Sequence, residues 1–280
     1  MAGVAYGTAF PMISVAIGGF TPLSIAFWRA VIGTASLGGW LLATRSFSAR
    51  PSPGSWLRLG VVALAGAGVF WPVQNYAVKL STPVNAAFLV SIYPALIAVA
   101  APAILRERAR GRSLVGLALA LSGAYLVLSN GRFLSFFSAD GAAGDGLALV
   151  AALSFGSYVI LGQLWRDKMG VTPEELSFFT FALSLPVLGV VAVTQGPLAV
   201  APSLASVSAL VWLGLVTSTA AFLALNAGIR RGAVARGSVH LLVIPLVSAL
   251  VSWGFFRETM SPIQWLGGAL VRAGIAASSR

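Results

Sequence analysis

Polar and aromatic side chains recur at one-turn spacing within the long apolar segments of this chain. Trp71, Asn75 and Lys79 are four residues apart, so a helix would present all three on one face. Phe222 and Asn226 repeat the first part of that pattern in the second half of the sequence. A polar group in apolar surroundings costs free energy unless it finds a partner. These side chains are therefore candidate ligands for a polar solute.

Further candidates of the same kind lie in other apolar segments. They are Tyr6, Asn85, Tyr158, Gln163 and His240. All ten residues together predict a ring around a central cavity. Its amide and hydroxyl groups would bind the two ends of a zwitterion, and its aromatic rings would pack on the zwitterion's side chain.

Several of these candidates have a plainer alternative role. Asn75 and Asn226 could hydrogen-bond neighbouring helices, as polar residues commonly do in membrane bundles. Trp71 could lie at a membrane interface, and Lys79 could be a charge at a helix end. His240 could carry a proton or serve as a neutral hydrogen-bonding residue. The sequence leaves these alternatives open.

Two prolines and two glutamates occupy equivalent positions in the two halves of the chain. Pro94 and Pro245 lie within apolar segments, where a proline removes a backbone hydrogen bond and kinks a helix. We expect this pair to act as hinges, with a static kink as the alternative. Glu107 and Glu258 each follow an arginine at a segment end, which predicts a gating or structural ion pair.

One arginine interrupts an early apolar segment. Arg29 is the eighth residue of segment 22–43. At ~1.5 Å per residue it would lie about 10 Å from the helix start, close enough for its side chain to snorkel to the outer face. No Asp or Glu occupies the middle of an apolar segment, which disfavours the exchange of a cationic drug for protons.

Composition sets the broad class of protein. The 280 residues are 58% hydrophobic and 9% charged, whereas soluble domains are about 25% charged. A soluble fold and a disordered chain are therefore excluded, and a polytopic membrane protein is indicated. The net charge of +11 comes from short basic clusters that form no face for a nucleic acid. With no Cys and one His, we expect no enzyme, no cofactor and no metal site.

Ten apolar segments are each close to the ~20 residues that a helix needs to cross a bilayer. They run over 2–19, 22–43, 57–78, 83–104, 113–129, 146–165, 174–194, 205–228, 233–255 and 262–278. A polar linker over 130–145 separates a first half, 1–129, from a second half, 146–280. Most Lys and Arg residues fall on the loops of one side. The positive-inside rule therefore places both termini in the cytoplasm, which in a bacterium indicates the inner membrane.

The two halves are internal repeats. A shift of 151 residues aligns Thr21-Pro22 with Thr172-Pro173, Asn75 with Asn226, Pro94 with Pro245 and Arg106-Glu107 with Arg257-Glu258. Each half contains five segments, and because five is odd the second half must enter the membrane from the opposite side. The predicted fold is an all-α polytopic membrane protein with ten transmembrane helices in two inverted five-helix repeats. Such repeats are typical of secondary transporters.

A motif shared by the two halves indicates a family. Its residues are Ala86-Ala87, Pro94, Glu107, Gly116 and Gly123, and again Gly237-Ser238, Pro245, Glu258, Gly267 and Gly274. This pattern resembles the EamA-type repeat of the drug/metabolite transporter superfamily over nearly the whole chain. Within that superfamily the chain looks most like the YddG-type exporters of aromatic and other amino acids. The second half departs from the pattern at Arg230–Gly232 and at Arg272.

The resemblance implies a secondary transporter that exports small metabolites, chiefly amino acids including aromatic ones. Transport would proceed by alternating access around a cavity between the repeats. The expected partners are the small-molecule substrate and the lipid bilayer, with no nucleic acid, and the chain is expected to be a monomer. The alternative is a carrier of another metabolite, such as a neutral drug, a nucleoside or an anionic sugar phosphate. A channel fits inverted repeats less well.

Overall fold

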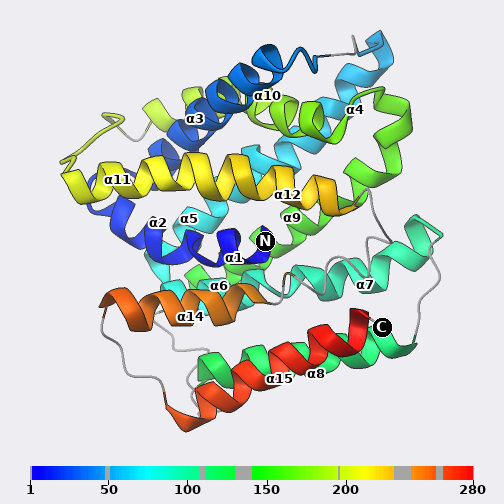
Figure 1. Ribbon diagram of the computed structural model, residues 1–280. Coiled ribbons are helices and arrows are strands. Elements are labelled where there is room, and N and C mark those ends of the chain that lie inside the picture. The colour runs from blue at the N-terminus through cyan, green and yellow to red at the C-terminus, as the bar shows by residue number, and fades with distance from the viewer. Residues whose placement is uncertain are drawn as a thin grey trace.

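The computed structural model is a bundle of helices (Figure 1) that describes residues 2–47, 51–106, 111–129, 141–194, 196–229, 241, 243–256 and 261–279. The first half contains α1 (Ala2–Gly7), α2 (Ala9–Ile17), α3 (Pro22–Ala43), α4 (Pro53–Ala63), the π-helical segment η1 (Leu64–Val69), α5 (Phe70–Leu80), α6 (Pro83–Val90), α7 (Tyr93–Ile104) and α8 (Gly111–Ser129). The second half contains α9 (Ala142–Met169), α10 (Pro173–Val193), α11 (Leu204–Trp212), the π-helical segment η2 (Leu213–Ala220), α12 (Ala221–Ile229), α14 (Val243–Phe256) and α15 (Pro262–Ser279).

Helices occupy the described part of each of the ten predicted spans, which confirms the predicted fold class. Six of the described helical stretches are long and apolar enough to cross a bilayer. The ninth span is described from Val243 onward. The sixth begins at Ala142, inside the stretch predicted as linker, because Asp145 in its first turn favours a helix N-terminus. It ends at Gly170, whose φ of 63° is the left-handed conformation that closes many helices.

The Thr-Pro pairs that the repeat aligns lie at equivalent helix starts. Thr21 and Thr172 each accept a hydrogen bond, from Ser24 N and Glu175 N respectively, and so cap α3 and α10. At Thr172 the cap is reciprocal, because a Glu175 carboxylate oxygen accepts a bond from Thr172 N at 2.7 Å. A proline follows each threonine, at the first helical position, where its missing N–H costs nothing. The Thr-Pro pairs therefore mark the same helix start in both halves.

The third and eighth spans contain π-helical segments at equivalent places. After each segment the α-helix resumes at Phe70 in the first half and at Ala221 in the second, positions that the 151-residue shift brings together. A π-helical turn weakens the usual backbone bonding, and side chains of neighbouring helices support it here. Ser154 Oγ donates to Ala65 O at 2.9 Å. In the second half, the Thr219 hydroxyl donates five residues back to Gly214 O at 3.0 Å.

Helices α8 and α15 pack side by side at one edge of the bundle (Figure 1). Their contact is made of glycines: a Cβ at Gly123 would lie 2.5 Å from Gly267 O, and a Cβ at Gly274 would lie 2.5 Å from Gly116 O. Gly116 and Gly267 are equivalent in the repeat, as are Gly123 and Gly274. Each half thus offers the same glycines to the other, in antiparallel register, as a two-fold axis in the membrane plane requires.

The fourth span is broken ahead of Pro94. Helix α6 ends at Val90 and α7 begins at Tyr93, so Pro94 lies in a first turn and not in a helix interior. Pro245 lies in α14, which is described from Val243 onward. For Pro94 the predicted position within a helix is therefore wrong, because the chain ends one helix and starts another where proline is well tolerated. Whether the pair hinges stays a prediction.

Candidate functional site

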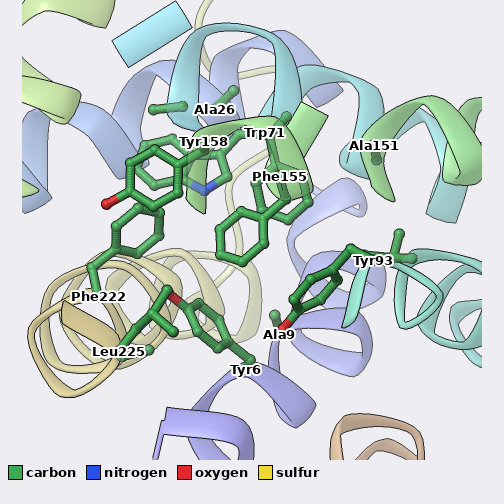
Figure 2. Close-up of a cluster of buried hydrophobic side chains, with 14 of the residues drawn as sticks. Tyr6, Ala9, Ala26, Trp71, Tyr93, Ala151, Phe155, Tyr158, Phe222 and Leu225 are labelled. Atoms are coloured by element: carbon green, nitrogen blue, oxygen red, sulfur yellow. The ribbon is translucent and has the colours of Figure 1, made fainter. Parts of the chain in front are cut away.

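A cluster of buried aromatic rings joins helices of the two halves (Figure 2). This aromatic cluster consists of Tyr6, Phe70, Trp71, Tyr93, Phe155, Tyr158, Phe181 and Phe222. Phe222 contacts five of the other rings, with centroids 4.9 Å away at Phe181 and 5.4 Å away at Tyr158. Tyr6 meets Phe155 edge to face at 5.8 Å, and Tyr93 meets Phe155 at 4.9 Å. The geometry is the one that aromatic quadrupoles favour.

Three polar atoms of the cluster have no hydrogen-bond partner among the described residues. The hydroxyls of Tyr6 and Tyr93 and the Trp71 indole N–H are buried and have no hydrogen-bond partner among the described residues. Buried polar atoms are bonded in the large majority of cases, so an unpartnered group calls for an explanation. These groups lie among aromatic rings contributed by both halves. The arrangement can hydrogen-bond a polar solute and pack on an apolar one.

Arg29 is the charged group beside this cluster. Its side chain is 1% exposed, and its guanidinium carbon lies 4.6 Å from the centre of the Trp71 ring. Arg29 Nε donates to Ser218 Oγ at 3.2 Å and one terminal nitrogen donates to Gln74 Oε1 at 3.3 Å. The other donates to Thr217 Oγ1 at 3.4 Å. Arg29 does not snorkel to the outer face, which the sequence had allowed, because its side chain hydrogen-bonds the hydroxyls of η2 and the amide of α5.

The side-chain nitrogen and oxygen of Asn75 have different surroundings. Its Nδ2 donates to Pro22 O at 2.8 Å, which ties α5 to the first turn of α3. That bond is the helix-to-helix role proposed as the alternative for this residue. Its buried Oδ1 has no partner in the described part of the chain. The nitrogen is therefore structural, and the oxygen is free to accept a bond.

The other predicted ligands divide into two groups. Lys79 is exposed at the end of α5, as the helix-end interpretation expects, and Asn85 and Gln163 are half-buried. None of the three belongs to the buried aromatic cluster. The remaining predicted positions, His240, Glu107, Glu258 and the side chain of Asn226, lie outside the described residues.

Sequence reasoning missed part of the site. Tyr93 and Phe155 were not among the predicted ligands, although Phe155 is equivalent to Tyr6 when the first helices are aligned with a small shift. Thr217 and Ser218 gave no signal, because hydroxyl residues are common in membrane helices. Arg29 was visible as a charge within a span, which by itself indicates function. The direction in which the Arg29 side chain points could not be predicted without knowing which helix packs beside it.

Comparison with known proteins supports a transporter. The family model for the EamA-like transporter family matches residues 1–129 and 142–280. An uncharacterized transporter of Archaeoglobus fulgidus is 27% identical over 95% of this chain and 91% of its own length. A protein of Streptantibioticus cattleyicolor named a probable terminal-alkyne amino-acid exporter is 25% identical over 99% of this chain and 90% of its own.

A solved crystal structure has the same fold. It superposes with a TM-score of 0.80 over 99% of this chain and 98% of its own, at 22% sequence identity. The two matches of the family model fall on the two inverted halves whose helices and glycines correspond above. The protein is therefore an integral membrane transporter of small molecules, and the chain belongs to the EamA-like transporter family.

Proposed function

We propose that this protein exports small metabolites, chiefly amino acids including aromatic ones, by alternating access around a site between its two halves. The observation that carries the proposal is the aromatic cluster, with its unpartnered Tyr6, Tyr93 and Trp71 polar atoms. An aromatic amino acid has both chemistries that these residues offer to bind. The name of the relative in Streptantibioticus cattleyicolor adds support for this substrate class.

The alternating movement is proposed to use the interruptions in the helices. Segments η1 and η2 and the break ahead of Pro94 lie next to residues of the cluster, since Trp71 follows η1 and Tyr93 precedes Pro94. A helix that is already interrupted can bend at that point without losing further backbone hydrogen bonds. Rocking one half against the other would then open the cluster to each side in turn.

Orientation and assembly are part of the same proposal. The excess of Lys and Arg on one set of loops supports a bacterial inner-membrane location with both termini in the cytoplasm. Export is the transport direction that this proposal assigns. We propose a monomer as the working unit, because the site is formed within one chain from residues of both its halves.

Uptake of labelled amino acids into liposomes that carry the purified protein tests the proposal. With equal pH inside and outside, we expect saturable uptake of phenylalanine, tryptophan or threonine that unlabelled competitor suppresses. Protein-free liposomes give the background. If neither equal pH nor a pH step produces uptake of any amino acid, the amino-acid proposal is refuted. The same liposomes then test the second candidate, an anionic metabolite, which the buried cation Arg29 favours.

Removing the unpartnered hydroxyl of Tyr6 should separate binding from stability. Tyr6→Phe removes an oxygen that has no described partner, so the melting temperature should stay the same or rise. If that hydroxyl binds substrate, the half-saturation concentration should rise about three- to tenfold, the worth of one neutral hydrogen bond. Titrated liposome uptake measures it. Tyr76→Phe, at a half-buried position outside the cluster, is the matched control and should leave uptake unchanged.

A further inference from the structure

We propose that Arg29 is the anchor for the carboxylate of the transported solute and that the aromatic cluster receives the rest of the molecule. This inference deepens the proposed function and rests on it. Three features of Arg29 support this role: it has no counter-ion among the described residues, it has donors that no described residue accepts from, and it lies on one side only of the pseudo-two-fold axis.

The first feature is the charge itself. A guanidinium keeps its proton in proteins, and placing it within a membrane span is costly unless an anion compensates its charge. Arg29 is 1% exposed, yet no carboxylate lies within ion-pair distance of it in the described part of the chain. Its described partners are the neutral oxygens of Ser218, Gln74 and Thr217. A buried cation with neutral partners alone is well suited to an anion that arrives with the ligand.

The second feature is the number of donors. A guanidinium has five N–H groups in a fixed fork. Three described hydrogen bonds, of 3.2 to 3.4 Å, account for three of them and are long for bonds to a charged group. Two N–H groups, one on each terminal nitrogen, have no acceptor among the described residues, and a carboxylate is the acceptor that matches the fork with two oxygens. The neutral partners hold the side chain in place without neutralising it.

The neighbouring ring selects the kind of carboxylate. The guanidinium lies 4.6 Å from the Trp71 ring centre, and Trp71 in turn contacts Phe222 at 6.0 Å and Phe181 at 5.1 Å. A solute whose carboxylate bound Arg29 would have its side chain next to these rings. The unpartnered Trp71 N–H is one further donor near that carboxylate. An aromatic amino or organic acid therefore fits better than an amine or a neutral solute.

The third feature is asymmetry. Repeat symmetry makes Thr180 equivalent to Arg29 and Gly66 equivalent to Thr217. Arg29 contacts Thr217, and the equivalent residues Thr180 and Gly66 are also neighbours. A Cβ at Gly66 would lie 2.8 Å from the Thr180 methyl group. The pair Arg29–Thr217 contains a cation, and the equivalent pair Thr180–Gly66 contains none. A single cation beside a nearly symmetric site would fix one orientation of the solute, with its carboxylate toward η2.

Competition experiments on the wild-type protein test the proposal without a mutation. Three unlabelled probes compete with labelled phenylalanine for uptake: phenylalanine, 3-phenylpropionate, which lacks the amino group, and phenylalaninamide, which lacks the carboxylate charge. We expect 3-phenylpropionate to compete and phenylalaninamide to be weaker than phenylalanine by about tenfold or more. Equal competition by phenylalaninamide would overturn the carboxylate anchor while leaving amino-acid transport established.

A substitution then assigns the preference to Arg29. In Arg29→Gln the affinity for phenylalanine should fall about tenfold or more, to that of phenylalaninamide, and the preference between the two should disappear. Arg29→Lys keeps the charge without the fork and should retain part of the preference. The control is Arg272→Gln, which removes an exposed arginine of α15 and should change neither. A preference unchanged in Arg29→Gln would contradict the assignment.

Thermal stabilisation of the detergent-solubilised protein keeps the test independent of transport. If phenylalanine is not transported but 3-phenylpropionate raises the wild-type melting temperature and not that of Arg29→Gln, the anchor stands and the amino-acid proposal fails. If no carboxylate stabilises the wild type or is transported by it, the anchor itself is refuted. Should Arg29→Gln not fold, Arg29→Lys keeps the assignment testable, because it should retain only part of the preference for a carboxylate.

Discussion

Leucine in place of Gly123 or Gly267 is expected to prevent the protein from folding to a monodisperse state. A Cβ at either position would lie 2.5 to 2.6 Å from the backbone oxygen of the other, so even alanine must push α8 and α15 apart. Overpacking a close contact costs about 1–3 kcal/mol for alanine-sized additions, and leucine adds three more carbon atoms. Size-exclusion chromatography and thermal unfolding in detergent measure the effect, with alanine as the graded intermediate.

The matched control for this glycine contact is Gly60→Ala. Gly60 lies within α4, and a Cβ there would meet nothing within 4 Å. Alanine also favours the helix by about 1 kcal/mol over glycine, so this variant should be as stable as the wild type or more so. A wild-type melting temperature in Gly267→Leu would show that the two helices do not pack through their backbones as described.

Truncation of Phe222 is expected to have the second largest effect. Phe222 is fully buried and contacts five rings of the aromatic cluster, so Phe222→Ala leaves a cavity where both halves meet. Such truncations cost about 3–5 kcal/mol in soluble cores. The loss of stability should be about 3 kcal/mol here, because lipid is as apolar as the core and only packing is lost. Thermal unfolding gives the loss of stability, and liposome uptake should fall with it.

A tryptophan on the outside of the bundle provides the control for Phe222. Trp40 lies on α3 and is 44% exposed, so Trp40→Ala removes a larger side chain without opening a cavity between the halves. Its unfolding temperature should stay close to that of the wild type. Equal losses in Trp40→Ala and Phe222→Ala would mean that the aromatic cluster is no more tightly packed than the outer surface.

Much of the fold follows from local patterns that need no tertiary information. Apolar length predicts the ten spans, and Thr-Pro pairs at 21–22 and 172–173 mark helix starts because capping is a local interaction. The breaks are harder to predict. A π-helical segment over Leu64–Val69 has the same apolar composition as an α-helix, and its support comes from Ser154, far away in the sequence. Pro94 indicated an interruption but not a helix start.

The candidate site was predictable only in part, for a related reason. Periodicity places Trp71 and Asn75 on one face of their helix, and both are buried. It does not reveal which helix lies opposite, so Tyr93 and Phe155 were missed. The depth of Arg29 followed from helix geometry, but its direction depends on Thr217 and Ser218, nearly 190 residues away. Contacts across the two halves are what local patterns cannot encode.

The matched π-helical segments also bear on the origin of the chain. A π-helical turn within an α-helix contains one extra residue, as a single-residue insertion would leave it. The helix resumes at equivalent residues after both segments, at Phe70 and at Ala221. A shared position for the extra residue is what duplication of one five-helix unit would produce, and it agrees with the 151-residue repeat of the sequence.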